Sequence, residues 1–397
     1  MYKRYAGQNA LSVKSHNFSI ILFNLLLHGT LSRSKLTHIT GLSATTITNI
    51  INELMAGGIV EESSDTILSA SESGLGRPRT ALQLSPDSRF VVGIHLGVGR
   101  AEIAITNLKA EIRAETTIRF DRDEAPSTVL NAIAAQVPVL MQDFDRDRFL
   151  GVGVGALGLV DPETGINIVA PNLHWHDLPI GEMLASQLNM PVSVNNNVRL
   201  MALGQAMFGI GKEANSLAYI QVREGIGAGL IINRQLYHGN LNTAGELGHT
   251  RLIVENGKQC SCGNIGCLET VAAVPYIVDE ARAFLSPAPA DLSFQDVLEA
   301  ATHNQDVQSL LEQSARYLGI ALANLINLIS PELIILGGIY ANSPDSMLTF
   351  VEEEIRRGVF ADLGDHIQLR TIASSSKAGL VGAAALALDK NFYHLNP

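Results

Sequence analysis

The sequence has few cysteines, a single tryptophan and little positive charge. Its 397 residues include three cysteines, and hydrophobic residues make up 46% against 17% charged ones. An odd number of cysteines in so long a chain argues against a disulfide-stapled secreted scaffold. This composition excludes a disordered chain, and the length is sufficient for two or three domains with their own cores.

No apolar run reaches the length that spans a bilayer. Residues 18–27 resemble the apolar core of a signal peptide behind Lys14, but they contain Asn24 and no small-residue cleavage site follows. We therefore predict that this segment is a buried helix of a cytoplasmic protein.

Positive charge is concentrated in one part of the chain. The net charge of −11 argues against a protein that coats nucleic acid or anionic membrane over its whole surface. Residues 1–85, however, carry seven Lys or Arg against five Asp or Glu, whereas the remainder carries 21 against 34. Contact with DNA phosphates is therefore easiest at the N-terminal end.

The N-terminal pattern predicts three helices within residues 19–61. Gly29 ends the first helix, residues 31–34 open a short second one, and Ser43 is a candidate N-cap for the third. The third helix has apolar residues at helical spacing, namely Ile47, Ile50, Ile51 and Leu54. Its opposite face begins with short polar side chains, which suit base edges in a major groove.

A basic β-wing is expected after this third helix. Its arms are residues 59–62 and 80–84, and the Gly-Arg-Pro-Arg segment between them suits an A·T-rich minor groove. The alternative is an ordinary helical bundle with a solvated loop, but the combined features favour a winged helix-turn-helix DNA-binding domain over residues 1–85. The candidate DNA contacts are Arg33, Lys35, Ser43, Thr45, Thr46, Thr48, Asn49, Arg77 and Arg79.

All three cysteines lie within residues 260–267, and His249 precedes them. Three thiolates and one imidazole make a closed tetrahedral site, so we predict a structural zinc ion bound by His249, Cys260, Cys262 and Cys267. Glycines at positions 263 and 266 allow the tight backbone that brings the sulfurs together. The alternative, three unpaired cysteines of a reduced core, fits this clustering less well.

From residue 86 onward, strand and helix patterns alternate, which predicts α/β layers. Glycine-rich turns are expected at residues 96–99 and 225–229; such turns can hold phosphate but are more often simple connections. The expected strands are residues 90–96, 100–107, 151–155, 216–222 and 332–338, and the expected helices are residues 127–144, 178–188, 199–208, 307–329 and 378–388.

Over nearly its whole length the chain resembles the ROK family of repressors and sugar kinases. The resemblance lies in residues 260–269 of the zinc loop, residues 244–249 (Ala-Gly-Glu-Leu-Gly-His), residues 170–173 followed by Trp175, and the N-terminal domain with its Gly-Arg-Pro element. It is greatest for the repressor branch, which includes xylose, N-acetylglucosamine and glucose-type repressors, because plain sugar kinases lack an N-terminal DNA-binding domain.

This resemblance implies an α/β fold in which a winged helix-turn-helix precedes an actin-like, sugar kinase-type two-lobed domain. We expect the latter to span residues 86–397. Its smaller lobe would comprise residues 86–194 and the C-terminal helix at 378–397. Its larger lobe would comprise residues 195–377, with the zinc loop at 249–269.

Two carboxylates that the resemblance leads one to expect in a kinase are missing. Family kinases carry Asp-x-Gly-Gly-Thr where this chain has His95-Leu-Gly-Val-Gly, so the metal-organising carboxylate is absent. They carry their base in Glu-Asn-Asp-Ala-Asn, where this chain has Asn-Asn-Asn197-Val-Arg. An amide cannot accept the proton, and each group supports a separate part of the transition state. We therefore predict that the chain is not an enzyme.

The sugar contacts that the resemblance implies are Asn172, Asn196, Asn197, Glu246, His249 and Glu269. A histidine that gives one ring nitrogen to zinc can donate its other N–H to a sugar hydroxyl. Alternatively, the two glutamates are ordinary surface carboxylates. Trp175 either packs in the core or lies beside the sugar.

Together these features predict a sugar-responsive transcriptional regulator, most simply a repressor of carbohydrate-metabolism genes. Its expected partners are a palindromic, A·T-rich operator and a sugar or sugar phosphate; a membrane is not expected. A homodimer or tetramer would present winged helices to both half-sites. Two alternatives remain, a regulator controlled by a protein antagonist and an active ATP-dependent sugar kinase.

Overall fold

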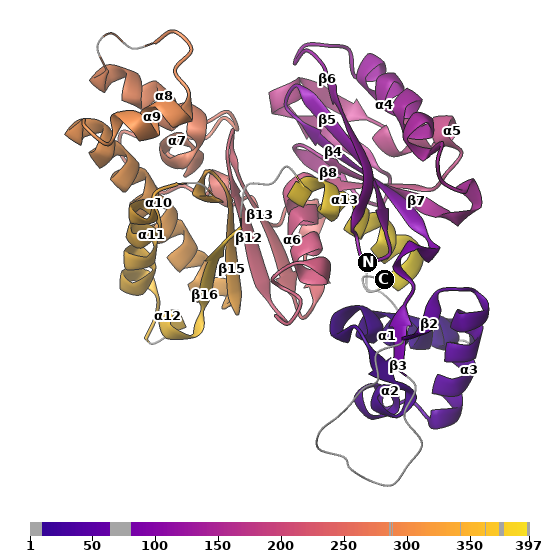
Figure 1. The fold of residues 1–397 in the computed structure, drawn as a ribbon. Coiled ribbons are helices and arrows are strands. Elements are labelled where there is room, and N and C mark those ends of the chain that lie inside the picture. Colours follow the sequence, from indigo (N-terminus) through magenta and orange to yellow (C-terminus); the bar gives the residue numbers. More distant parts are fainter. Residues whose placement is uncertain are drawn as a thin grey trace. The chain divides into compact units, whose positions relative to one another are not determined.

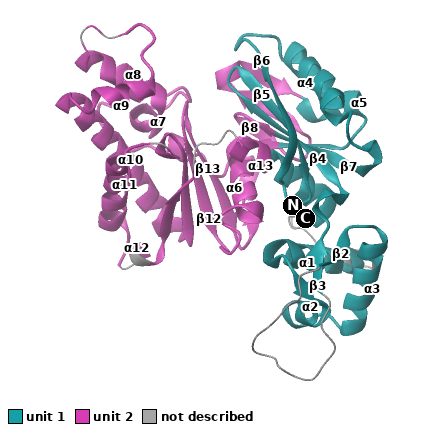
Figure 2. Cartoon of the chain, in the orientation of Figure 1, with its two compact units in different colours: residues 1–154, 179–194, 383–397 teal, residues 155–178, 195–382 magenta. Residues whose placement is uncertain are grey.

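The computed structural model describes residues 10–394 except 64–80, 286, 288, 342, 362 and 373–376. The chain divides into two compact units (Figure 2). Residues 1–154, 179–194 and 383–397 form the first, and residues 155–178 and 195–382 form the second. None of the helices among the described residues combines the length and apolarity that crossing a membrane requires.

The N-terminal head, whose described elements run from Ala10 to Leu84, combines three helices with a small antiparallel sheet (Figure 1). The first helix begins earlier than expected, because residues 10–18 contain neither glycine nor proline. The helices are α1 (Ala10–His28), α2 (Arg33–Thr40) and α3 (Ala44–Ala56), and the strands β1 (Leu31–Ser32), β2 (Val60–Ser63) and β3 (Ala81–Leu84) have the order β1-β3-β2.

The predicted turn between α2 and α3 is confirmed. Gly41 adopts a left-handed conformation (φ 71°), and its N–H donates to the Thr37 carbonyl. The Ser43 hydroxyl accepts the Thr46 N–H at 3.1 Å, as an N-cap does. The predicted apolar face of α3 is buried: Ile47, Ile50, Ile51 and Leu54.

Strands β2 and β3 confirm the two arms of the wing, since Val60 pairs with Leu84 and Ser63 with Ala81. The segment between the arms, with Arg77 and Arg79, lies outside the described residues. DNA contact by these two arginines therefore stays a prediction.

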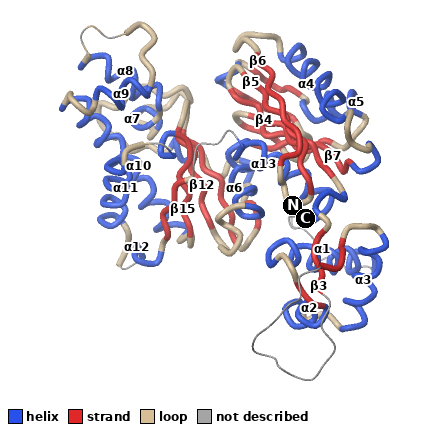
Figure 3. Tube along the Cα trace, viewed as in Figure 1, coloured by secondary structure: helices blue, strands red, loops and turns tan. Residues whose placement is uncertain are grey.

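The rest of the first unit consists of helices and a five-stranded sheet of order β11-β7-β4-β5-β6; the ends of β7 and β11 and the first half of α13 belong to the second unit. Helix α4 packs on β5 and β6 and against α5, as Figure 3 shows. Gly153 of β7 is required because a Cβ there would lie 1.9 Å from the Ala383 carbonyl oxygen of α13. The elements are β4 (Phe90–Gly97), β5 (Arg100–Asn107), β6 (Ile112–Arg119), β7 (Phe149–Ala156), β11 (Val192–Asn196), α4 (Pro126–Met141), α5 (Ile180–Leu188) and α13 (Lys377–Leu388).

The second unit contains a sheet of order β14-β13-β12-β15-β16 and a small sheet of order β10-β9-β8. The strands are β8 (Leu159–Asp161), β9 (Ile166–Ala170), β10 (Trp175–Leu178), β12 (Leu217–Val222), β13 (Ile226–Ile232), β14 (Gln235–Leu236), β15 (Leu333–Gly338) and β16 (Gln368–Thr371). The helices are α6 (Asn197–Phe208), α7 (Glu269–Ala272), α8 (Val274–Ala281), α9 (Phe294–Ala300), α10 (Gln305–Ile329), α11 (Asp345–Gly358) and α12 (Leu363–His366).

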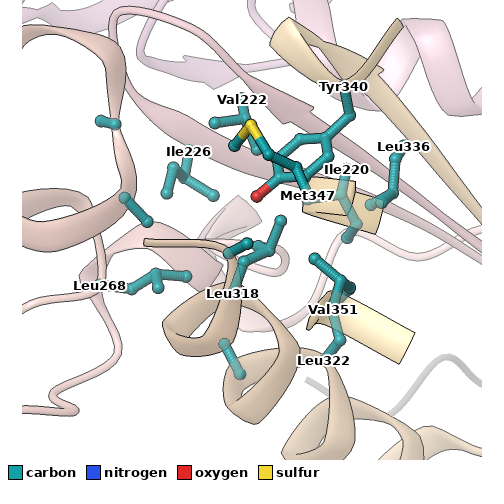
Figure 4. Packing of buried hydrophobic residues seen from close by; sticks show 14 of the residues in the cluster. Ile220, Val222, Ile226, Leu268, Leu318, Leu322, Leu336, Tyr340, Met347 and Val351 are labelled. Carbon is teal, nitrogen blue, oxygen red and sulfur yellow. The ribbon is translucent and has the colours of Figure 1, made fainter. Parts of the chain in front are cut away.

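Strand β12 shows how this larger sheet is buried on both faces. Ile220 and Val222 pack in the cluster that contains residues of α10 and α11, whereas Leu217 and Tyr219 pack with residues of α6. Figure 4 shows the first of these clusters, in which Leu268 belongs to the same core. Leu268, the residue before Glu269, is thus anchored in the core of the second unit.

The ten strands and helices expected between residues 90 and 388 are confirmed with small shifts of their ends. The expected glycine turn at residues 225–229 is wrong in part, because β13 begins at Ile226. A Cβ on Gly229 would lie 2.7 Å from the Val198 carbonyl oxygen, so this glycine permits close packing of α6 on the strand.

Candidate functional site

The predicted metal ligands converge within the second unit. One donor atom from each of His249, Cys260, Cys262 and Cys267 lies within 4.8 Å of the others. The Cys262 and Cys267 sulfurs are 3.7 Å apart, and the Cys260 sulfur is 3.6 Å from His249 Nδ1. Tetrahedral zinc with bonds of about 2.3 Å to sulfur and about 2.0 Å to nitrogen requires ligand separations of this size. A disulfide requires about 2.05 Å, so the donor set fits zinc and not a cystine.

The backbone of the loop explains why the ligands converge. Gly263 and Gly266 have φ values of 90° and 79°, in the left-handed region that favours glycine. A Cβ on Gly266 would lie 2.0 Å from the Ile253 carbonyl oxygen, and the Cys260 N–H donates to the Asn264 carbonyl at 2.8 Å. The predicted role of these glycines is confirmed.

The thiols differ in their environments. Burial raises the pKa of Cys267 to about 12, whereas a hydrogen bond from the Asn264 backbone lowers the pKa of Cys262. A metal must therefore displace a proton from Cys267, and zinc binding should strengthen as pH rises.

Two glutamates lie beside this cluster. Glu269 begins α7; its Oε1 accepts the Ile226 N–H at 2.8 Å, and its Oε2 is 3.9 Å from His249 Nδ1. Its side chain is only 12% exposed, so the interpretation of Glu269 as a surface carboxylate is wrong. Glu246, immediately before Leu247–His249, is half exposed; partial burial raises its pKa, while Arg199 acts against this shift.

The asparagines at the N-terminus of α6 take part in local structure. Asn196 Oδ1 accepts the Val198 and Arg199 N–H groups at 2.9 and 3.1 Å, and Asn196 Nδ2 donates to the Gly158 carbonyl at 2.9 Å. Asn197 Oδ1 accepts the Val198 N–H at 2.9 Å, and the residue is buried. Part of the hydrogen-bonding capacity of both amides is therefore already used.

Gly158 connects the N-terminus of α6 with the segment that contains Asn172, because its carbonyl accepts from Asn196 and its backbone packs against Ala170. A Cβ on Gly158 would lie 2.8 Å from Ala170 Cα, two residues before Asn172. Asn172 itself is exposed, while Trp175 in β10 is buried, as expected for the core-packing alternative.

Sequence analysis missed Arg199, which connects α6 to the segment preceding Glu246. Its Nε and Nη2 donate to the Ala244 carbonyl at 3.2 and 2.9 Å, and Nη2 donates to the Asn242 carbonyl at 2.6 Å. Nη2 is also 3.9 Å from Glu246 Oε1. The available signal was an arginine between apolar helix residues, Val198 and Leu200, which is unusual for a solvated side chain.

His95, which the resemblance places where family kinases carry a metal-organising aspartate, lies in the first unit. Its Nε2 is 4.0 Å from Glu102 Oε2 on β5, and both side chains are buried. Arg100 Nε is 3.8 Å from Glu102 Oε1. This carboxylate therefore has two cationic or potentially cationic neighbours on its own hairpin.

The candidate DNA contacts of the head differ in exposure. Thr45, Thr48 and Asn49 are exposed on α3, as is Lys35 on α2, whereas Thr46 is partly buried. Ser43 uses its hydroxyl as a helix cap, and the partly buried Arg33 contacts the Met55 sulfur at 3.6 Å. Asn52, which is not among the candidates from the sequence, is also exposed on α3, one helical turn beyond Thr48 and Asn49.

Comparison with known proteins identifies the family. The ROK family matches residues 91–390. The chain belongs to the ROK family. It is similar to the xylose repressor of Bacillus subtilis, at 28% identity over 381 residues that cover 95% of this chain and 96% of the repressor. It is also similar to the glucokinase of Halalkalibacterium halodurans, at 29% identity, covering 75% of this chain and 94% of the enzyme.

A solved ROK family transcriptional regulator, a homolog of the Escherichia coli Mlc protein, matches with a TM-score of 0.82. The identity is 26%, and the match covers 96% of this chain and 98% of the regulator. The predicted family and fold class are thus confirmed: an N-terminal helical segment precedes the two-lobed, actin-like sugar kinase fold. The His249, Cys260, Cys262 and Cys267 cluster is typical of the ROK zinc-binding motif.

Proposed function

We propose that this ROK protein is a cytoplasmic, sugar-responsive repressor of carbohydrate-metabolism genes. The observation that carries the proposal is the extent of the relatives. The xylose repressor matches both the head and the ROK domain, whereas the glucokinase matches only about the length of the ROK domain.

Residues 1–85 would bind DNA and residues 86–397 would bind the effector. Thr45, Thr48 and Asn49 on α3 have the exposure needed to reach base edges, and Lys35 has the charge to contact phosphate. Arg77 and Arg79 would extend into the minor groove. A homodimer would read a palindrome whose half-sites are about 34 Å apart, or a multiple of this spacing.

Glu246, His249 and Glu269 would form the acceptor and donor set that recognises sugar hydroxyls, with Asn172, Asn196 and Asn197 as further contacts. Zinc bound by His249 and the three cysteines would supply structural support only, because four protein ligands leave no position for a reacting group. The same loop then fixes the orientation of His249 and Glu269.

Phosphoryl transfer is not part of the proposal. Asn197 is an amide and cannot accept a proton from a sugar hydroxyl, and the imidazole at residue 95 is paired with Glu102. Neither group therefore performs the role of the corresponding kinase aspartate, and we propose recognition without transformation.

The experiment combines operator selection with effector screening. The purified full-length protein is used to select fragments from genomic DNA, and the bound operator is then titrated with sugars and sugar phosphates in the presence or absence of ATP. We expect one ligand class to weaken operator binding at least tenfold, with no sugar phosphate formed. ATP-dependent phosphorylation would support a kinase, and release only by an added cell protein would support the antagonist alternative.

A further inference from the structure

The buried guanidinium of Arg199 contacts the centre of the segment formed by residues 240–246, which has few other hydrogen bonds to the rest of the described fold. Its side chain is 2% exposed, and its Nε and Nη2 groups donate to the carbonyls of Asn242 and Ala244. The segment ends at Glu246. Arg199 thus contacts backbone on the N-terminal side of a candidate ligand-binding carboxylate and lies near that carboxylate itself.

This segment contains strained backbone. Leu241 and Asn242 have φ values of 56° and 55°, and the left-handed region is unfavourable for a bulky residue such as leucine. The Leu241 side chain is 78% exposed, so burial does not compensate for the strain. Contacts from the surrounding fold must therefore impose this path.

Other hydrogen bonds tie the segment to the rest of the fold mainly at its ends, and within the segment the Thr243 hydroxyl donates to the Asn240 carbonyl at 3.0 Å. The Ala244 N–H donates to the His238 carbonyl at 3.0 Å, and the Ala228 N–H donates to the Gly245 carbonyl at 2.8 Å. In the centre, Asn242 Nδ2 is at the long distance of 3.5 Å from Asp161 Oδ1. The 2.6 Å bond from Arg199 to the Asn242 carbonyl is much shorter.

Burying a guanidinium costs free energy unless hydrogen bonds compensate for its lost hydration. Burial lowers the pKa of Arg199, and Nη1 is buried with no hydrogen-bond partner among the described residues. A guanidinium donates from several nitrogens in a fixed plane, whereas an ammonium is a single point. A lysine would therefore not reproduce the contacts to two carbonyls and Glu246.

We infer that Arg199 is a positioning residue that holds residues 242–246 in their ligand-binding form and sets effector affinity through Glu246. This inference rests on the proposed sugar response of the same site, but we expect Arg199 to hold residues 242–246 in the ligand-free protein as well.

The first test measures the segment in the ligand-free, full-length protein. In Arg199→Lys and Arg199→Gln we expect the amides of residues 240–246 to exchange hydrogen at least tenfold faster, while zinc content stays at one per chain. Arg234 is the matched control, because it also donates to backbone carbonyls, those of Lys212 and Glu213, but is exposed. Unchanged exchange in both Arg199 variants would overturn the inference.

The second test separates positioning from general stability. With the sugar found by the effector screen, we expect each Arg199 variant to bind about tenfold or more weakly. In a Glu246→Gln background, adding Arg199→Gln should weaken binding by less than twofold, because the group through which it acts is already removed. If the affinity losses of the two single variants instead multiply in the double variant, Arg199 does not act through Glu246. If the wild type binds no sugar, the proposed effector fails, while the exchange result still decides whether Arg199 holds the segment.

Discussion

At the scale of single residues, the metal ligands and three of the candidate sugar contacts, Glu246, His249 and Glu269, occupy the same short stretches of chain. His249 belongs to the metal cluster and follows Glu246 by three residues, while Glu269 follows Cys267 by two. Leu268 between them is fully buried, and its N–H donates to the Thr250 carbonyl. We therefore expect movement of the metal loop to shift Glu269 and His249, which would couple metal binding to the proposed effector binding.

Replacing Cys267 with serine should remove zinc and destabilise the ROK domain. Structural zinc contributes about 10 kcal/mol or more to small zinc domains, so we expect a loss of several kcal/mol in the free energy of unfolding. Elemental analysis and denaturant unfolding measure the two effects. Ser261→Ala is the control, because Ser261 is exposed and lies between ligands without belonging to the cluster. Full zinc occupancy in Cys267→Ser would contradict the assignment.

The sequence predicted the metal ligands but not Arg199, for a physical reason. Three of the ligands are rare side chains in one loop, and zinc restricts which residue types can converge there. The partners of Arg199 are backbone carbonyls 43 and 45 residues further along the chain. Every residue has a carbonyl, so nothing in the sequence marks these as acceptors.

At the scale of secondary-structure elements, the sequence predicted the helices and strands whose own residue pattern is sufficient to identify them. The 3.6-residue period of α3 specifies a helix, and the short lengths of the apolar runs of β12 and β15 favour strands. The two-residue β1 and β14 carry no such period, and each forms because a longer strand offers hydrogen bonds. Such elements depend on tertiary pairing and were not predictable.

Helix α3 and the basic residues of the head should affect DNA binding differently. Substituting Thr48 and Asn49 with alanine is expected to cost about 1–3 kcal/mol for each lost base contact and to relax sequence preference. Substituting Lys35, or Arg77 with Arg79, should weaken binding to all sequences and reduce the slope of log affinity against log salt by about 1 for each lost phosphate contact. Filter binding over a salt series with operator and scrambled DNA distinguishes these outcomes.

A matched control for this series is Thr37→Ala, since its hydroxyl donates within α2 to the Arg33 carbonyl as the Thr48 hydroxyl donates within α3 to the Ala44 carbonyl, but Thr37 is partly buried and lies outside α3. It should leave operator affinity close to that of the wild type. Equal losses on operator and scrambled DNA for the Thr48 and Asn49 variants would instead show that α3 does not read bases.

At the scale of the whole molecule, this chain is similar both to a glucokinase and to a xylose repressor, so the fold of the ROK domain alone does not determine which activity it has. Under the proposed function, His95 and Asn197 stand where family kinases are expected to carry aspartates, while Glu246, His249 and Glu269 would supply groups that can bind sugar hydroxyls. The proposed role of this domain is therefore to bind a sugar without transforming it. A binding domain affects the head only if the ligand has different affinities for two states of the protein.

This requirement gives a quantitative prediction for the full-length protein. If a sugar weakens operator binding tenfold, the coupling free energy is about 1.4 kcal/mol, and operator DNA must weaken sugar binding by the same tenfold factor. Calorimetric titration of the sugar into free protein and into the protein–operator complex, at one salt concentration, measures both sides of this cycle. The control is scrambled DNA at equal concentration, which should leave sugar affinity unchanged. If sugar affinity is the same with and without operator, the sugar does not shift the DNA-binding equilibrium, and release in cells must come from another molecule such as a protein antagonist.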